Sequence, residues 1–405
     1  MLMSKYTNKT TREITTNYNK HFKEKRIMKK SYLMIAVASL VFGACANEST
    51  VQELKETVNE QAISFNSITG NVTKAAIGSI DNLKTETGFI VYGYKTLNNW
   101  TSIAQTVFSG KNVYWDAAAN NNAGDWVYQG LRFWDKNGTY KFFAVAPNNP
   151  TDGATYSINE TLGNSFGYIT ITGANSNKST ASDDYLIDRN GAIELGSNHT
   201  GATNPDVAID FHHVMAKVSF ALKSTLASGT ITVTALKMTG WNNAAGTFVQ
   251  ASATTPDALN CAEWTLATPA VAGDIDLVGS GTGNASGVEL TCSSTATATA
   301  LADWYIMVPQ QIVPTINNNG TPDDASDDFP TAGLTFTVTY TYNDGLTPAY
   351  EETFTNQVAI VPTTQTWGTD SYTTYTLDIK PNAINFDVDQ ICGFCVDANV
   401  DVEVK

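Results

Sequence analysis

Apolar and polar residues alternate along most of the chain with a period of two, which is the pattern of half-buried β-strands. The longest such run covers residues 207–222, and clear shorter ones cover residues 88–94 and 139–146. Segments of the same kind, separated by turn residues, recur at 230–238, 246–249, 304–308, 334–342, 351–361 and 371–379. Short strands that recur in this way predict an all-β fold built from β-sandwiches.

The end of the chain has the most regular alternation. Polar residues stand between the members of one apolar face, which are Val396, Ala398, Val400, Val402 and Val404. The period of two predicts a half-buried strand. Because it is the last strand, it either pairs within its own domain or is donated to a neighbouring molecule as an added strand. The sequence leaves both readings open.

A different pattern precedes the strands at residues 28–45. Lys29 and Lys30 are followed by an apolar run of 11 residues, 32–42, and then by Gly43, Ala44 and Cys45. Spanning a bilayer takes about 20 residues, so this run indicates a secretory signal peptide rather than a membrane helix. The cysteine directly after two small residues makes it similar to a bacterial lipoprotein signal, with Cys45 as the lipidated first residue.

The residues around this signal divide the chain. Residues 1–27 are polar and basic, and because a signal normally starts its own chain we expect Met28 to be the initiator and 1–27 an upstream mis-start. The signal peptide is then 28–44 and residues 45–61 form a tether. A linker-like stretch at 196–206 places the boundary between an N-terminal β-sandwich domain, 62–205, and a C-terminal one, 206–405.

The charge balance excludes one class of partner. Residues 1–44 carry nine basic and two acidic residues, so the chain from Cys45 onward has 15 basic and 37 acidic residues and a net charge of −22. A chain this acidic lacks the positive surface that nucleic acids require, and it is poorly suited to anionic membrane surfaces.

The cysteines of an exported protein are candidates for disulfides. Cys392 and Cys395 form a C-x-x-C between strand-like segments, which favours a local disulfide over redox catalysis. Cys261 and Cys292 are the second candidate pair, although the sequence does not fix the connectivity.

No other motif predicts catalysis, a cofactor or a metal site. His212 and His213 alternate onto opposite faces of one strand, so they are poor ligands for a single ion. The acidic loop 323–328 lacks the spacing of a calcium loop. Trp100, Trp115, Trp126 and Trp134 could stack on sugars, but the core of a sandwich is the better interpretation.

Several pieces of the chain, in order and spacing, resemble the fimbrillins, the lipoprotein precursors of type V pili in Bacteroidales. Besides the signal ending at Cys45, the matching pieces are 63–65, 73–75, 89–94, 140–147, 207–213, 216–218, 367–369, 372–379 and 384–386. They extend over nearly the whole chain after the signal.

The resemblance implies two transthyretin-like β-sandwich domains and an assembly pathway. The precursor would be lipidated, carried to the outer membrane and cut by a protease that removes its first strand. The emptied groove would then accept an extended strand from another subunit. By analogy the cut falls between Lys74 and Ala75 and removes the strand at 63–73. The family usually has arginine at this position, so Lys74 calls for a protease of trypsin-like specificity.

The sequence therefore predicts a structural, non-enzymatic pilus subunit at the cell surface. Its expected partners are other pilin subunits, the lipid on Cys45, the processing protease, and glycans or proteins of host or bacterial surfaces. The alternative is a monomeric surface lipoprotein that binds glycans.

Overall fold

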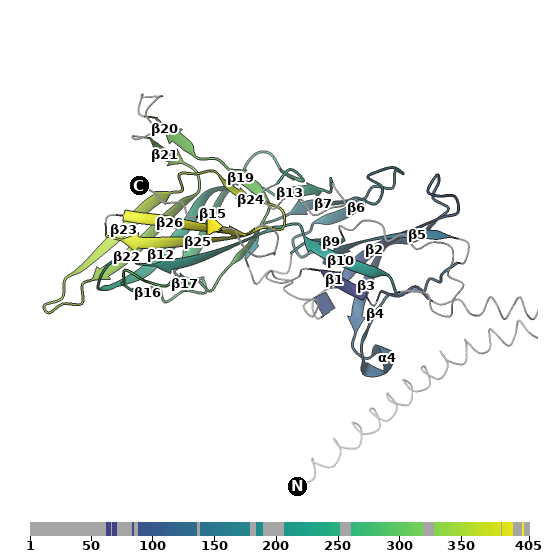
Figure 1. Ribbon diagram of the computed structural model, residues 1–405, viewed down its shortest axis with the longest axis horizontal. Helices are drawn as coiled ribbons and strands as arrows, with labels where there is room; N and C mark the ends of the chain where they lie inside the picture. Colours follow the sequence, from purple (N-terminus) through teal and green to yellow (C-terminus); the bar gives the residue numbers. More distant parts are fainter. Residues whose placement is uncertain are drawn as a thin grey trace, which may run out of the picture. The chain divides into compact units, whose positions relative to one another are not determined.

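The computed structural model describes residues 62–65, 67–70, 83–84, 88–135, 138–178, 184–188, 206–251, 261–318, 328–381, 383–391 and 399–400. These residues form an almost entirely β structure, as predicted (Figure 1). Contacts group residues 61–405 into one compact unit. Among the described residues, no helix has the length and apolarity needed to cross a membrane.

Two sheets are built mainly from the N-terminal half. Sheet 1 has the strand order β1 (Ser67–Gly70), β10 (Ala208–His213), β9 (Leu186–Asp188), β5 (Thr139–Ala146), β2 (Phe89–Thr96), β3 (Gln105–Asp116) and β4 (Asp125–Val127). Sheet 2 has the order β14 (Trp264–Leu266), β13 (Gly246–Val249), β7 (Ile169–Ala174) and β6 (Thr155–Ile158).

Two further sheets form the C-terminal sandwich. Sheet 3 has the order β27 (Asn399–Val400), β26 (Ala383–Ile391), β25 (Tyr372–Lys380), β11 (Ala216–Lys223), β18 (Tyr305–Met307) and β8 (Asn177–Lys178), with β17 (Thr299–Ala300) also on β11. Sheet 4 has the order β15 (Ala272–Val278), β12 (Thr230–Asn242), β22 (Thr335–Asn343) and β23 (Glu351–Ile360), with β16 (Val288–Thr291) also on β12.

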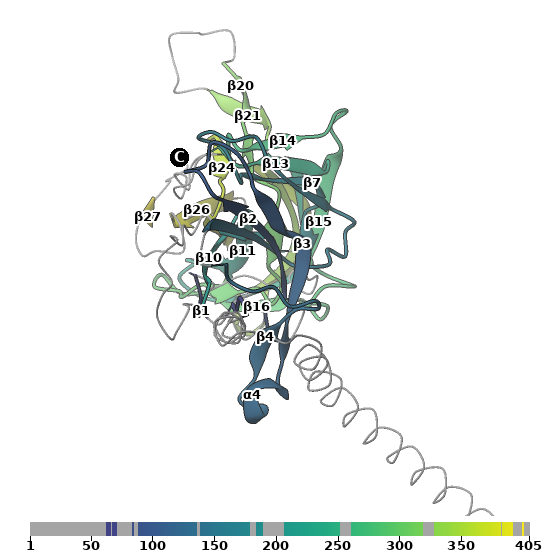
Figure 2. The same ribbon diagram turned by 90° about the vertical axis from the view of Figure 1, so that its right-hand side faces the viewer.

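The described structure also contains two small two-stranded sheets and one short helical turn. Strand β19 (Gln310–Ile312) pairs with β24 (Gln365–Trp367), and β20 (Thr315–Asn317) pairs with β21 (Phe329–Ala332). The segment α4 (Ala119–Asn122) stands at the tip of the β3–β4 hairpin (Figure 2). Asn120 and Asn121 adopt left-handed backbone angles there, so α4 is an asparagine-rich turn rather than a regular helix.

The alternation in β2 and β5 explains why sheet 1 has a core on each face. In β2, Phe89 and Val91 point into one hydrophobic cluster, and Tyr94 points into another. In β5, Phe142 and Phe143 are divided in the same way. The cluster on the Phe143 side also contains residues of sheet 2, so sheet 2 packs on this face. The cluster on the Phe142 side is closed by the segment that contains Ile63 and Phe65.

The C-terminal core lies between sheets 3 and 4. Phe220 of β11 and Tyr375 of β25 pack against Phe336 of β22, and all three side chains are buried. Alternate residues of β12 from Ile231 onward complete the opposite wall. The observed sandwich has the pattern that the sequence predicts for this half.

One predicted strand, residues 207–222, is wrong as a single element. It is divided at Val214 and Met215, where β10 ends in sheet 1 and β11 begins in sheet 3. Both residues are buried, and their carbonyl oxygens accept hydrogen bonds from Trp264 Nε1 and the Asp370 amide. The chain therefore passes from sheet 1 to sheet 3 at these two residues.

Strands from the two halves also pair with one another. Strand β13 pairs with β7, and β18 pairs with β8. Residues 62–205 and residues 206–405 therefore do not form separate sheets, because each of these two segments contributes strands that pair with strands of the other.

Candidate assembly groove

Residues 62–65 lie in a groove of sheet 1 and are held there by backbone contacts on both sides. The Ile63 amide donates to the Arg132 carbonyl at 2.8 Å. The Tyr128 hydroxyl donates to the Ile63 carbonyl at 2.8 Å, and the Val207 amide donates to the Ser64 carbonyl at 2.7 Å. We call the segment 62–70 the plug, because its first residues fill this groove and β1 continues it.

Phe65 is the deepest residue of the plug. Its side chain has no exposed surface and lies among four aromatic rings in edge-on geometry. The ring centroids lie at 5.6 Å (Phe108), 5.8 Å (Tyr128), 6.1 Å (Phe89) and 6.1 Å (Phe142). Ile63, two residues earlier on the same face, is 1% exposed. Edge-on aromatic pairs contribute beyond the area that they bury, so this cage is specific for a flat, large side chain.

The rim of the groove is acidic. The Ser64 hydroxyl donates a hydrogen bond to the exposed carboxylate of Asp206. Asp125 lies close enough to be affected by that charge: burial raises the pKa of Asp125, a hydrogen bond from the Trp126 amide lowers it, and the Asp206 charge raises it further. The side chain at position 64 therefore lies beside a hydrogen-bond acceptor, the Asp206 carboxylate, in a region of negative potential.

The remainder of the plug is an edge strand. Strand β1 pairs with β10 in parallel over four residues, from Ser67 with Ala208 to Gly70 with Phe211, and has no strand on its other side in the described sheet. Ala62 adds a single antiparallel bridge to Phe133. The plug is thus held by two buried side chains and a short ladder.

Most residues predicted for lipidation, processing, disulfide formation and strand donation lie outside the described part of the chain. These are Cys45, Lys74, Ala75, Cys392, Cys395, Val396, Ala398, Val402 and Val404. Val400 is described, and it pairs with Val388 in the antiparallel β26–β27 ladder. Where the tail is described, it therefore pairs with its own sheet.

The candidate disulfide between Cys261 and Cys292 is not formed, because both are free thiols. Cys292 is buried in the core of the C-terminal sandwich. Cys261 comes before β14, which belongs to sheet 2. The two cysteines thus lie in different parts of the fold.

The tryptophans of the N-terminal half are mainly core residues. Trp126 and Trp134 are 5% and 4% exposed, and both belong to the cluster that encloses Phe65. Trp115 is half-buried against Trp126 under the ammonium of Lys84, and Trp100 is half-buried with Lys141 over its ring. They do not form a stacking platform for sugars.

The two neighbouring histidines have separate surroundings. His212 pairs with Asp210 at 3.3 Å near the surface, whereas His213 is buried and pairs with buried Asp184 at 3.0 Å. Burial lowers the pKa of His213, but the Asp184 carboxylate more than offsets this, so the pKa lies above its ordinary value. Within the described ranges, no three metal-ligating side chains gather at one place.

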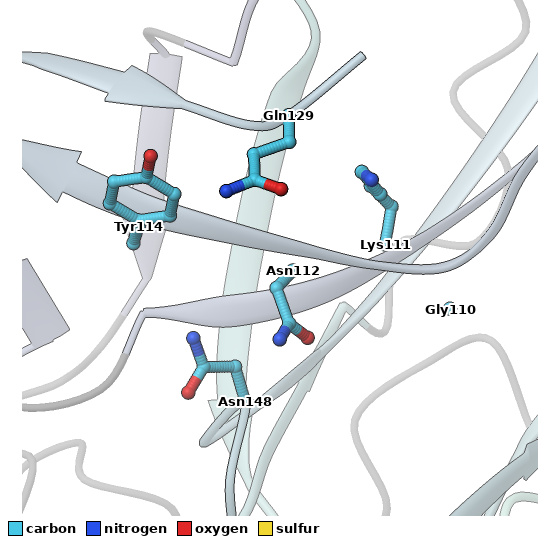
Figure 3. Close-up of a pocket in the computed structure, with 6 residues that line it drawn as sticks. All are labelled: Gly110, Lys111, Asn112, Tyr114, Gln129 and Asn148. Atoms are coloured by element: carbon cyan, nitrogen blue, oxygen red, sulfur yellow. The ribbon is translucent and has the colours of Figure 1, made fainter.

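A shallow polar pocket of about 410 Å³ lies on the β3 side of sheet 1 (Figure 3). Its lining comes from β3 and from the residues that follow β4 and β5: Gly110, Lys111, Asn112, Tyr114, Gln129 and Asn148. Three side-chain amides can both donate and accept hydrogen bonds, and the Tyr114 ring is 42% exposed. No sequence pattern marks this pocket, because its residues come from three separate segments.

The chain matches the family described as Fimbrillin-like over residues 73–391. No curated protein sequence matches it. A crystal structure of a fimbrial protein from Bacteroides vulgatus is similar at 23% identity and a TM-score of 0.54, covering 82% of this chain and 99% of that one.

Two other solved structures are more distant. A fimbrial assembly protein from Parabacteroides distasonis has 10% identity and a TM-score of 0.29 over 82% of this chain and 100% of that one. The tip fimbrial protein Mfa3 from Porphyromonas gingivalis, with a C-terminal truncation, has 10% identity and a TM-score of 0.31 over 82% of this chain and 99% of that one. The family match spans well over half of the sequence, so this chain belongs to the Fimbrillin-like family.

Proposed function

We propose that this protein is a pilus subunit that polymerises by donor-strand exchange after a protease removes its first strand. Family membership and the fimbrial structure of similar fold support a role as a fimbrial or adhesion subunit. The observation that carries the finer proposal is Phe65, which is fully buried in an aromatic cage yet belongs to a segment upstream of the expected cut.

The contacts of the plug suit a removable part. Burial of Ile63 and Phe65 contributes roughly 1.5–3 kcal/mol each, so the plug keeps the groove closed in the precursor. A cut between Lys74 and Ala75 would separate the plug from the sheet that it fills, because every groove wall named above follows residue 75. The family match begins at Thr73, next to this bond.

The emptied groove would be unstable in isolation. It would expose the rings around Phe65 and leave the Arg132 carbonyl and the Val207 amide without their strand partners. An extended segment of another subunit would cover these rings and would bond to the two backbone groups. Recognition by an added strand of this kind is called β-augmentation. The protein in this scheme binds and polymerises, and it performs no catalysis.

The earlier steps follow from the N-terminal signal. Lipid on Cys45 would carry the precursor to the outer membrane, and a protease of trypsin-like specificity would cut after Lys74. The lipid and the plug would then leave together, so lipidation of Cys45 would serve to target the precursor to the outer membrane and would not anchor the assembled subunit. The subunit remains at the cell surface in the pilus, where adhesion to host or bacterial surfaces takes place.

Mass spectrometry of protein taken from the cell surface tests this proposal. We expect precursor chains lipidated at Cys45 and assembled chains that start at Ala75. An unheated denaturing gel should give a ladder of high-molecular-weight bands. Surface protein that starts at lipidated Cys45 and runs as a single band would contradict the proposal and support the monomeric lipoprotein.

The polar pocket is the one observation that favours glycan binding as a second candidate function. Amide side chains beside an exposed tyrosine ring suit a ligand rich in hydroxyl groups. Glycan-array binding that is lost in Tyr114→Ala and retained in the exposed control Leu97→Ala would support it. Equal binding by both variants, or none by the unmodified chain, would reject it.

A further inference from the structure

The plug has a near copy of its own sequence elsewhere in the chain. Residues 62–66 read Ala-Ile-Ser-Phe-Asn, and the first five residues of β26, 383–387, read Ala-Ile-Asn-Phe-Asp. Both segments place isoleucine and phenylalanine two residues apart, so the pair shares one face of any extended strand.

From this match we infer that β26 of a second copy, rather than the tail at residues 396–404, is the strand that enters the emptied groove. Ile384 and Phe386 then take the places of Ile63 and Phe65. The inference rests on the proposed function, because it names the partner for the same groove.

The size of the cage favours β26. Phe65 fills a space bounded by four aromatic rings, and its own ring is fully buried. The largest apolar side chain of the tail is valine, which would leave part of this space empty. Unfilled space in a close-packed core is destabilising, because the lining atoms lose their contacts. Phe386 restores the lost ring.

The acidic rim favours β26 for an independent reason. Position 64 contacts Asp206 through a donated hydrogen bond. Asn385 supplies an N–H donor at this position. The tail has four registers that put two of its apolar residues at positions 63 and 65, and they bring Asp397, Asn399, Asp401 or Glu403 to position 64. Three of the four place a carboxylate beside Asp206.

The remaining register of the tail is the best that it offers. Asn399 then stands at position 64, with Ala398 and Val400 in the places of isoleucine and phenylalanine. Both side chains are smaller than those that they replace. In this register the tail matches the plug except that its two apolar side chains are too small. Enlarging them, by Ala398→Ile and Val400→Phe, should therefore convert the tail into a donor.

The position of β26 in sheet 3 is compatible with release. On one side it pairs with β25 over nine residues, and on the other the described ladder to β27 has only two (Figure 1). Ile384 is only partly buried against the C-terminal core. Donation gives up the nine-residue ladder with β25, and it gains the fully enclosed site of Phe65 together with the shorter ladder that the plug makes with β10.

Peptide binding to the processed chain tests the inference. The chain carries a site-specific protease sequence at the bond between Lys74 and Ala75. After cleavage it is mixed with synthetic nonapeptides of residues 383–391 or 396–404. Native mass spectrometry measures displacement of the cut N-terminal fragment and binding of the peptide. Because the substitutions are placed in the peptides, the folding of the protein is unaffected.

We expect the β26 peptide to bind at least 10-fold more tightly than the tail peptide. Phe386→Ala should abolish this advantage, and Phe386→Leu should retain part of it. A tail peptide with Ala398→Ile and Val400→Phe should bind like the β26 peptide.

Two results would overturn the inference. If the tail peptide binds as tightly as the β26 peptide, or more tightly, the tail is the donor and the proposed function stands. If neither peptide enters the groove and the cleaved chain forms no polymer, the inference fails together with the proposed function.

Discussion

The plug ends in β1 at the edge of sheet 1, whereas β26 lies next to the edge strand of sheet 3, and the two are held by different contacts. The plug has a four-residue ladder but inserts a fully buried phenylalanine. Strand β26 has a nine-residue ladder to β25. Two buried side chains and a short ladder hold the plug in the precursor. If the plug leaves, the groove offers a compact binding site to another strand that carries the same side chains. Side-chain fit, rather than ladder length, therefore determines how selectively the plug is held.

The largest expected effect is the truncation Phe65→Ala in the uncut precursor. Loss of a fully buried ring costs about 3–5 kcal/mol of unfolding free energy, because four aromatic neighbours lose their partner. Chemical denaturation measures this loss. Leu97→Ala, at a side chain that is 63% exposed, is the control and should change the free energy by less than about 0.5 kcal/mol. Equal effects would mean that the plug does not support the core.

The truncation Ile384→Ala in the uncut chain should have a smaller effect, on the order of 1–2 kcal/mol, because this side chain is only partly buried. Chemical denaturation again gives the value. If Ile384→Ala lowered the free energy of unfolding as much as Phe65→Ala does, the plug and β26 would not differ in how strongly their side chains hold them.

The acidic rim should make closure depend on pH. The pKa of Asp125 is raised in the folded state, so its charged form is disfavoured there and its penalty is present above the folded pKa. Lowering the pH from 7 through that pKa should relieve the penalty. Asp125→Asn should stabilise the precursor at pH 7 and flatten this dependence. Hydrogen exchange at the Ile63 amide measures it, and an unchanged profile in the variant would contradict the assignment.

The smallest effect is expected for Val400→Ser in the full chain. If β26 is the donor, this change in the tail should leave the amount of polymer within about twofold of the unmodified chain, since Val400 makes no contact in the groove. Band intensities on an unheated gel give the measurement. Loss of the ladder would identify the tail as the donor strand.

The alternating pattern predicted many of the strands, among them β2, β5, β22 and β25, but it did not mark β3 or β15. Local alternation contains this information, since the period of two marks each strand and its buried side. It also placed the tryptophans in the core. The residues that form the cage around Phe65 could not be named, because they come from β2, β3, β5 and the segment after β4.

The division of the strand at Val214 and Met215 was also beyond the sequence. The apolar positions shift by one residue there, from Ile209 and Phe211 in β10 to Val218 and Phe220 in β11. A β-bulge within one strand would give the same shift, so the pattern alone does not indicate a change of sheet. The change of sheet depends on contacts from Trp264 and Asp370, which are distant in the chain. The period of two indicates which side chains are buried, but it does not indicate which sheet the strand joins.

A cross-link from the groove tests strand exchange most directly. A photoreactive amino acid replaces Phe133, which is 45% exposed and bridges Ala62 at the rim. Assembly of a mixture of isotopically light and heavy chains, followed by mass spectrometry, identifies the captured strand. We predict links to residues 62–65 of the same chain in the precursor, and to a C-terminal strand of a different chain in the polymer. A polymer in which the groove still links to residues 62–65 of its own chain would contradict strand exchange.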